Sequence, residues 1–174
     1  MKISERVVAT QSPRLQGLRP QVAADTRLLL LGSFPGVASL HAQQYYGHPR
    51  NQFWRLLGEV LDLPFAASDY ERRLNLLAEA GVGLWDVITH THREGSLDSA
   101  IREPLGSDLI SLTAGLPDLR TIAFNGGTAA RIGLRQLGVA AMRYRIVLLP
   151  SSSPAYTRPY ADKLTAWQQL NKPP

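Results

Sequence analysis

Residues 28–54 read LLLLGSFPGVASLHAQQYYGHPRNQFW, and this stretch decides how the rest of the chain is interpreted. The apolar run at 28–31 predicts a buried strand. The run ends in a glycine- and proline-containing turn at 32–36, and residues 48–51 lead into a helix that we expect to begin near Asn51. Open α/β sheets bind ligands where the carboxyl ends of their strands release into such turns. We therefore expect a site for a phosphate-bearing, aromatic ligand in the first third of the chain.

The composition sets limits on the class of protein. The chain has 174 residues, 44% apolar and 19% charged, which suits one globular domain with a real core. We expect a single domain over residues 1–174, with 1–26 as an N-terminal arm that includes a short strand at 6–9. The net charge is +5, and all but three of the basic residues are arginines. This balance favours a polyanionic partner, because guanidinium groups suit phosphates and base edges.

The chain contains no cysteine, which rules out disulfides, cysteine nucleophiles and thiolate-bound metals. Its first residues lack the apolar region of a signal peptide, and no apolar run approaches the length that spans a membrane. We therefore expect a cytoplasmic protein that makes no membrane contact.

Strand-like and helix-like segments alternate along the chain. Apolar segments predict buried strands at 27–31, 82–88, 120–124 and 145–149. Periodicity and capping residues predict helices at 51–61, from Ser68 or Asp69 to about 80, at 107–114, from the turn at 125–128 to about 138, and at 159–170. Residues 89–99, THTHREGSLDS, are expected to form a polar loop. The alternation predicts an α/β fold, a three-layer α/β/α sandwich with a central four-stranded parallel sheet.

The turns after the four predicted strands should converge at one edge of such a sheet. They lie at 32–36, 86–92, 125–128 and 151–158. Each has a simpler interpretation as a chain reversal, a helix cap or a solvated loop. The functional interpretation depends on the small or amide residues at all four strand ends, because backbone N–H groups at the following helix starts bind anions.

Several familiar kinds of catalytic site are not indicated in these turns. The serines and histidines form no nucleophile-elbow pattern, a Walker loop is missing, and no lysine falls in a predicted turn. A metal site at His48, His90 and His92 is a disfavoured alternative, because carboxylate partners at a clear spacing are missing. What remains is amides, hydroxyls, aromatic rings and Asp86. Such a set can position a water, stack a ring and stabilise developing charge.

Four motifs resemble the uracil-DNA glycosylase superfamily: GSFPG…YYGHPRNQFW, GLWDVI, FNGG and LPSSSPA. The resemblance covers residues 27–167 and is strongest to the DNA-deoxyinosine, or hypoxanthine-DNA, glycosylase branch. It implies a DNA repair enzyme that flips out a deaminated base and hydrolyses its N-glycosidic bond, leaving an abasic site. Hypoxanthine is the expected base, with uracil and xanthine left open. Phe34 departs from the acid or amide that most branches carry in the first turn, and a phenyl ring cannot orient water.

The resemblance also implies which residues act. Asn51 and Asn125 would be catalytic, with Asn51 holding the attacking water and Asn125 binding the base or that water. The base-binding residues would be Gly32, Ser33, Phe34, Pro35, Gly36, Tyr46 and Asp86. The DNA-binding residues would be Arg50, Ser151, Ser152, Ser153, Pro154, Tyr156 and Arg158, with either Tyr156 or Arg158 as the wedge that enters the duplex.

Other interpretations stay open. Asn51 would also serve as a helix N-cap, and Asp86 would also pair with Arg93 or Arg102. At the level of function, the alternatives are a uracil or thymine mismatch glycosylase and a non-catalytic nucleic-acid-binding module on the same fold. Under the main interpretation we expect no cofactor, no metal and a monomer. The partner would be double-stranded DNA carrying a deaminated base, with single-stranded DNA left open.

Overall fold

A four-stranded parallel sheet lies at the centre of the computed structural model, which describes residues 13–172. The strand order is β3-β2-β6-β7, and the strands are β2 (Leu28–Gly32), β3 (Val82–Asp86), β6 (Thr121–Asn125) and β7 (Arg145–Leu149). The predicted parallel sheet is therefore confirmed. The short strand predicted at 6–9 lies outside the described residues.

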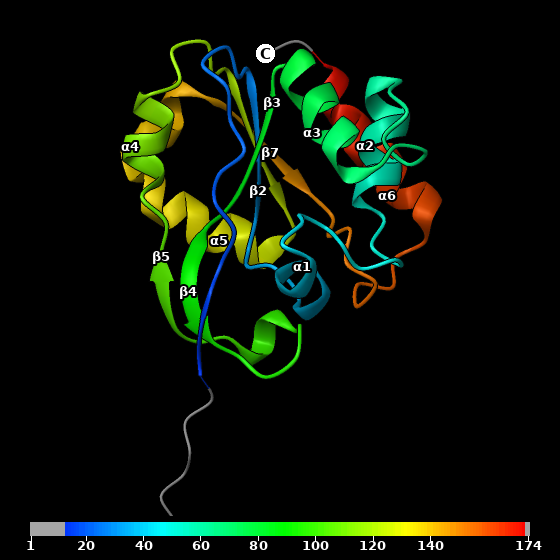
Figure 1. The fold of residues 1–174 in the computed structure, drawn as a ribbon. Helices are drawn as coiled ribbons and strands as arrows, with labels where there is room; N and C mark the ends of the chain where they lie inside the picture. Colours follow the sequence, from blue (N-terminus) through cyan, green and yellow to red (C-terminus); the bar gives the residue numbers. More distant parts are fainter. Residues whose placement is uncertain (1–12, 173–174) are drawn as a thin grey trace, which may run out of the picture.

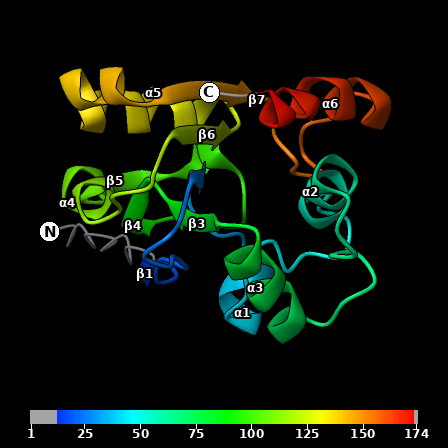
Figure 2. The ribbon, with the colours of Figure 1, turned by 90° about the horizontal axis from the view of Figure 1, so that it is seen from above.

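Helices cover both faces of this sheet, which confirms the predicted three-layer α/β/α arrangement. Figure 2 shows α4 (Leu109–Ala114) and α5 (Gly127–Leu137) on one side, and α2 (Phe53–Leu61), α3 (Tyr70–Glu79) and α6 (Tyr160–Trp167) on the other. The chain continues from α6 into a 3-10 helix, η3 (Gln168–Asn171). The predicted helix at 51–61 begins two residues later than expected, and Asp69 rather than Ser68 caps α3 by accepting a hydrogen bond from the Arg72 N–H.

Residues 28–31 are all leucines because helices cover both faces of β2, so side chains on either face are in an apolar core. Leu30 belongs to the core beneath α2, α3 and α6, whereas Leu29 and Leu31 belong to the core beneath α4 and α5. None of the three is accessible to solvent. A strand buried on both faces shows a continuous apolar run rather than alternation, so the pattern that predicted a buried strand is explained by the layers.

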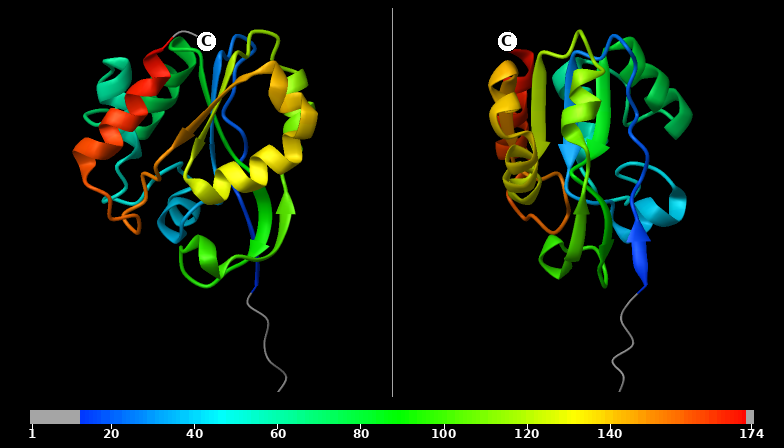
Figure 3. Two further views of the ribbon diagram at one scale, coloured as in Figure 1. Left: turned by 180° about the vertical axis from the view of Figure 1, so that it is seen from behind. Right: turned by 90° about the vertical axis from the view of Figure 1, so that its left-hand side faces the viewer.

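A second sheet corrects the sequence interpretation. The predicted strand at 82–88 ends at Asp86, and the chain then forms β4 (Ile88–His92) in a three-stranded antiparallel sheet with β1 (Arg14–Gln16) and β5 (Arg102–Gly106). The prediction that 89–99 is a polar loop is therefore wrong for its first four residues. Strands were predicted from apolar runs, and β4 shows no such run because it is mostly polar and only partly buried. Its Thr91 is buried, and both of its histidines are partly exposed. Figure 3 shows this small sheet extending from the end of the parallel sheet.

Shorter elements complete the fold. Helix α1 (Val37–Ala42) lies between the turn at 32–36 and residues 48–51 and was not among the predicted helices. Two 3-10 helices, η1 (Asp98–Ala100) and η2 (Gly138–Arg143), follow β4 and α5 respectively. Helix α1 was missed because it is short and Gly36 gives it no side-chain cap.

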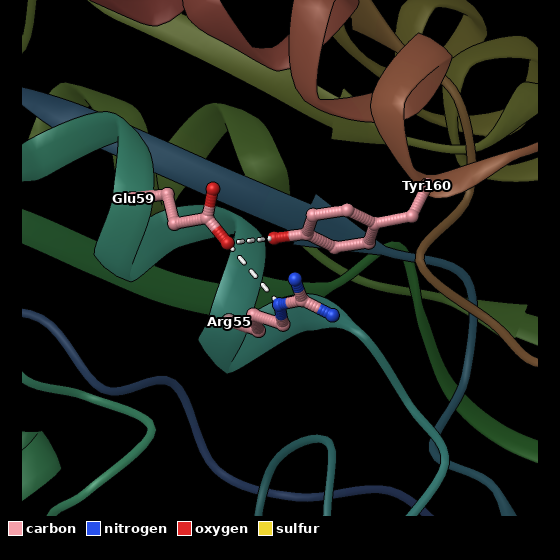
Figure 4. Close-up of polar contacts among 3 residues, drawn as sticks. All are labelled: Arg55, Glu59 and Tyr160. Carbon is pink, nitrogen blue, oxygen red and sulfur yellow. Dashed lines mark hydrogen bonds and ion pairs between the residues drawn. The ribbon is translucent and has the colours of Figure 1, made fainter.

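A surface cluster joins α2 to α6, the helices that follow two of the loops at the sheet edge. Glu59 Oε1 accepts hydrogen bonds from Tyr160 Oη at 2.7 Å and from Arg55 Nε at 3.1 Å, and the Arg55 guanidinium lies 3.9 Å from the centre of the Tyr160 ring (Figure 4). Exposed ion pairs contribute at most about 1 kcal/mol each. The cluster therefore helps align two helices whose main contact is apolar.

Candidate functional site

The carboxyl ends of the four parallel strands meet at the lower edge of the sheet in Figure 1. Strand pairing places Gly32 opposite Asp86, and Asn125 opposite Leu149. The turns that follow these residues were predicted to converge. The register shows that they start from neighbouring positions on one edge.

A cavity of about 500 Å³ lies at this edge. This volume is within the range of roughly 300–1,000 Å³ that small-molecule sites occupy. All of the predicted site residues except Arg50 and Arg158 line it: Gly32, Ser33, Phe34, Pro35, Gly36, Tyr46, Asn51, Asp86, Asn125, Ser151, Ser152, Ser153, Pro154 and Tyr156. Arg50 and Arg158 are exposed and adjoin segments that do line the cavity. Asn51 and Asn125 therefore share one cavity, which the predicted roles require.

Asn125 is buried and binds the loop that follows β7. Its Nδ2 donates to Ser152 Oγ and its Oδ1 accepts from the Ser152 N–H, both at 2.9 Å. A carboxamide has two donor hydrogens and two acceptor lone pairs. One of each is used by Ser152, which leaves one donor and one acceptor position. The carboxamide also interacts with the Tyr46 phenol and opposes the rise in its pKa that burial causes.

Asn51 lies just before α2, but the N-cap residue of the helix is Gln52, so the simpler interpretation of Asn51 as the N-cap is off by one residue. Its Oδ1 accepts a hydrogen bond from the Phe53 N–H at 3.0 Å, while the next residue, Gln52, donates its N–H to Ser152 O at 3.0 Å. Among the hydrogen bonds of residues 13–172, none uses the Asn51 Nδ2 donors. Asn51 thus satisfies the first N–H of α2 through its oxygen, its Nδ2 makes no hydrogen bond within these residues, and the residue lines the cavity.

Asp86 is a buried carboxyl at the end of β3, only 4% exposed. Its Oδ2 has no hydrogen-bond partner. Burial raises the pKa of Asp86 to about 7; the Asp98 carboxylate adds to this rise and the Arg93 guanidinium opposes it. A carboxyl with this pKa changes charge near neutral pH, and Asp86 is one of the residues that line the cavity.

The alternative of an ion pair at Asp86 is not supported. Arg93 donates instead to the carbonyls of Pro35 and Gly95, and Arg102 to those of Ser99 and Ile101. The ion pairs found in the described part of the chain do not include Asp86.

Tyr46 lies beside Asp86 and Gly32. Its ring stacks on Phe53 with a centroid distance of 3.7 Å and an interplanar angle of 10°. Its Oη is buried without a hydrogen-bond partner, and burial raises the pKa of the phenol above its usual value. A Cβ on Gly32 would collide with Asp86 Oδ1 and lie 3.1 Å from Tyr46 Oη. Glycine is therefore required where strand β2 passes these two polar groups.

The turn at 32–36 leaves several backbone donors without partners. Its carbonyls are used, because Gly32 O accepts from the Val87 N–H at 2.9 Å and Ser33 O from the Ile88 N–H at 3.1 Å. No backbone hydrogen bond found among residues 13–172 uses the N–H groups of Ser33, Phe34 or Gly36. Phe34 itself is 5% exposed and packs in the core, with the Arg93 guanidinium 5.0 Å from its ring centre.

Several cavity residues were not predicted from the sequence. They are Ala38, Ser39, Tyr45, His48, Ser96, Leu97 and Asp98, whereas Gly126, Gly127, Thr128 and Ala155 fall within the turns predicted at 125–128 and 151–158. His48 had been considered only as a metal ligand, and its Nδ1 accepts from the Arg50 N–H at 3.1 Å. Within the described residues there is no group of three or more acidic or histidine side chains placed to hold a metal, so the alternative metal site at His48, His90 and His92 is not supported.

Lys163 binds the backbone of the loop at 151–158, which lines the cavity. It is 1% exposed, and its Nζ donates to Tyr156 O at 2.7 Å and to Ser153 O at 3.5 Å. Burial lowers its pKa. The sequence placed no lysine at the site edge, and Lys163 indeed does not line the cavity but holds the backbone of a loop that does.

In the part of the chain that is described, every helix is too short or too polar to span a membrane.

Comparison with known proteins gives one consistent result. Residues 19–171 match the family model of the uracil DNA glycosylase superfamily. The chain is 36% identical over 157 residues to a hypoxanthine DNA glycosylase of Methanosarcina barkeri, covering 90% of this chain and 98% of the relative. It is 39% identical over 146 residues to a hypoxanthine DNA glycosylase of Methanosarcina acetivorans, covering 84% and 90%. The solution NMR structure of a candidate uracil DNA glycosylase from Methanosarcina acetivorans superposes with a TM-score of 0.80 at 36% identity, covering 91% of this chain and 96% of that one.

Proposed function

The chain belongs to the uracil DNA glycosylase superfamily and is a DNA glycosylase, and we propose that it removes hypoxanthine from DNA by hydrolysing the N-glycosidic bond. The relatives named above are hypoxanthine DNA glycosylases, which supports this choice of base. The proposed partner is double-stranded DNA bound by a monomer. The proposed location is the cytoplasm.

One observation carries the proposal: residues from two neighbouring strand ends that line the cavity carry an acceptor and several donors that make no hydrogen bonds. Asp86 Oδ2 is the acceptor, and the donors are the N–H groups of Ser33 and Phe34, which follow the residue paired with Asp86. Hypoxanthine presents a ring N–H next to a carbonyl oxygen, which complements this pair. Adenine presents an unprotonated ring nitrogen next to an amino group, which would leave both sets of polar groups unpaired. Unpaired buried polar groups cost about 1–3 kcal/mol each.

The base reaches this wall only after it leaves the duplex. Extrusion of a base costs on the order of a few kcal/mol, and least for a poorly paired base, which already favours deaminated bases. The extruded base is proposed to stack on the face of Tyr46 opposite Phe53, since Phe53 covers the other face. A preorganised stack lowers the cost of holding the base in place.

The reaction is then the hydrolysis of a glycosidic bond with an oxocarbenium-like transition state. Asn51 is proposed to hold the attacking water through its Nδ2 group, which the hydrogen bond from the Phe53 N–H to Oδ1 leaves available. Asn125 is proposed to contact the base or that water with its remaining donor and acceptor, while Ser152 fixes its side chain. The negative charge that develops on the leaving base falls next to the N–H groups of the turn at 32–36, where fixed donors stabilise it.

The product is proposed to be an intact abasic site. Neither Lys163 nor Lys172, the lysines that the structure describes, lines the cavity, so an amine nucleophile is not positioned there. The test is a panel of duplexes carrying hypoxanthine, uracil, xanthine or a G·T mismatch, scored for released base and abasic sites. Fastest release of hypoxanthine supports the proposal. Release of only uracil or thymine would contradict it, as would strand cleavage trapped by borohydride.

A further inference from the structure

The loop between β4 and β5 carries an exposed leucine at the cavity. Leu97 is 55% exposed and lines the cavity together with its neighbours Ser96 and Asp98. Single exposed leucines are common on protein surfaces. In the described part of the chain, however, Leu97 and Tyr156 are the only exposed large apolar side chains that line this cavity. They come from two different loops at the same end of the molecule (Figure 1).

The loop at 93–101 is anchored on the turn at 32–36. Asp98 Oδ1 accepts from Ser33 Oγ at 2.7 Å, and Ser96 Oγ accepts from the Val37 N–H at 2.9 Å. Arg93 adds hydrogen bonds to the carbonyls of Pro35 and Gly95. Leu97 thus stands between two anchored residues, so its position relative to the base-binding turn is fixed.

The charge of this loop determines what it can meet on DNA. The exposed charged residues of this loop, Glu94 and Asp98, are acidic, whereas its Arg93 is buried, and exposed acidic groups disfavour contact with phosphates. The exposed arginines near the cavity, Arg50 and Arg158, adjoin other segments of its lining. An apolar side chain on an acidic loop is suited to the base stack, whose interior is uncharged, rather than to the sugar–phosphate backbone.

Building on the proposed function, we propose that Leu97 inserts into the base stack beside the extruded nucleotide, opposite the loop that carries Tyr156. Apolar side chains that enter between bases unstack them and stabilise a distorted duplex. The wedge would then consist of two side chains from two loops, of which sequence comparison points only to the Tyr156 loop. Leu97 is a positioning residue in this scheme, because it acts on the DNA around the reacting nucleotide and not on the reacting atoms.

The first test does not depend on base release. A duplex carries a stable abasic-site analogue with 2-aminopurine next to it, and fluorescence is read at saturating protein, with binding followed by anisotropy. Wild-type protein should change the fluorescence by filling the gap, Leu97→Ala should lose most of that change while still binding, and Leu97→Met should restore it. Met142→Ala is the control, because Met142 is 89% exposed and does not line the cavity. An unaltered signal from Leu97→Ala would overturn the inference.

The second test separates insertion from chemistry. Single-turnover release of hypoxanthine is compared on a duplex and on a single strand of the same sequence, which has no stack of paired bases to open. Leu97→Ala should be slowed about tenfold or more on the duplex and little on the single strand. Equal slowing on both would place Leu97 in the base pocket and contradict insertion. If wild-type protein releases no hypoxanthine from the duplex or from the single strand, the proposed function fails. The fluorescence test still decides the role of Leu97 in that case.

Discussion

Asn125 and Ser152 exchange two hydrogen bonds, each 2.9 Å long, and so fix the end of strand β6 to the loop that follows β7. Ser152 also accepts a hydrogen bond through its carbonyl from the Gln52 N–H, one residue after Asn51. One buried serine therefore connects the two asparagines proposed to act in catalysis. The cavity keeps its shape because three segments far apart in the sequence meet at this residue.

This connection predicts unequal effects of substitution at its two ends. Asn125→Ala removes both hydrogen bonds and leaves the Ser152 N–H and hydroxyl buried without partners, so it should lower the free energy of unfolding by about 1–3 kcal/mol. Ser152→Ala keeps the bond from its own N–H to Asn125 Oδ1 and should cost less. Urea unfolding measures both. Equal losses would contradict the predicted inequality, and no loss from Asn125→Ala would show that the connection does not stabilise the fold.

Gly32→Ala should damage the wall of the cavity more than the fold. The added methyl group collides with Asp86 Oδ1 and comes within 3.1 Å of Tyr46 Oη, so one of the two polar groups must move. We expect a loss of hypoxanthine release larger than the accompanying loss of stability, compared by single-turnover kinetics and urea unfolding. Gly115→Ala is the control, because a Cβ there comes no closer than 3.4 Å to a neighbouring atom and Gly115 does not line the cavity. Wild-type release by Gly32→Ala would contradict the proposed role of this wall.

The buried carboxyl of Asp86 should make stability depend on pH in a definite direction. Because burial raises its pKa from 3.8 to about 7, the folded protein holds the proton more tightly than the unfolded chain does. The free energy of unfolding should therefore fall as pH rises from about 4 to about 7. Between these two pKa values the fall is about 1.4 kcal/mol for each pH unit. Asp86→Asn removes this loss, so its stability relative to wild type should increase over that range and then level off. A constant difference between the two proteins from pH 4 to pH 8 would contradict the raised pKa.

Asp86 should also shape the pH dependence of catalysis. If its ionised form accepts the ring N–H of the base, kcat/KM for hypoxanthine release should increase as pH rises toward and through about 7, and then reach a plateau. Asp86→Asn should abolish that limb of the profile along with most of the activity. A rate that falls as pH rises through 7 would instead mean that the protonated carboxyl is the active form.

The sequence predicted the parallel sheet well because both of its faces are buried, so strands such as 28–31 appear as uninterrupted apolar runs. It predicted the turns at 32–36, 125–128 and 151–158 for the same reason, since each follows a strand end, but of the turn predicted at 86–92 only Asp86 lines the cavity, because 88–92 forms β4. It missed β4 because that strand consists mostly of polar residues. The strand also pairs with β1, which lies more than 70 residues earlier in the chain. Residues brought to the cavity by that second sheet, including Leu97 and Asp98, carried no local signal.

The polar details of the site were beyond the reach of the sequence. Family resemblance selected Asn51, Asn125 and Asp86. It did not show that both the nitrogen and the oxygen of the Asn125 carboxamide form hydrogen bonds with Ser152. Nor did it show that Asp86 Oδ2 and Tyr46 Oη lack partners. Such features arise from packing between segments that are distant in the chain, so only the folded arrangement displays them.

The most direct test of the account is base release by Asn51 variants. Because Asn51 Oδ1 accepts from the first N–H of α2, Asn51→Ala also weakens the start of the helix, by about 1 kcal/mol. Asn51→Ser keeps a hydroxyl able to cap while removing the carboxamide, and Asn75→Ala on the exposed face of α3 is a control away from the cavity.

Single-turnover hypoxanthine release and duplex affinity are measured for all three variants and the wild type. The account predicts that both Asn51 variants lose release by roughly 10²–10³-fold while binding the duplex as wild type does. It predicts that Asn75→Ala behaves like wild type in both measurements. Release by Asn51→Ser at the wild-type rate, or a loss of binding equal to the loss of release, would contradict the claim that this carboxamide directs water at the sugar.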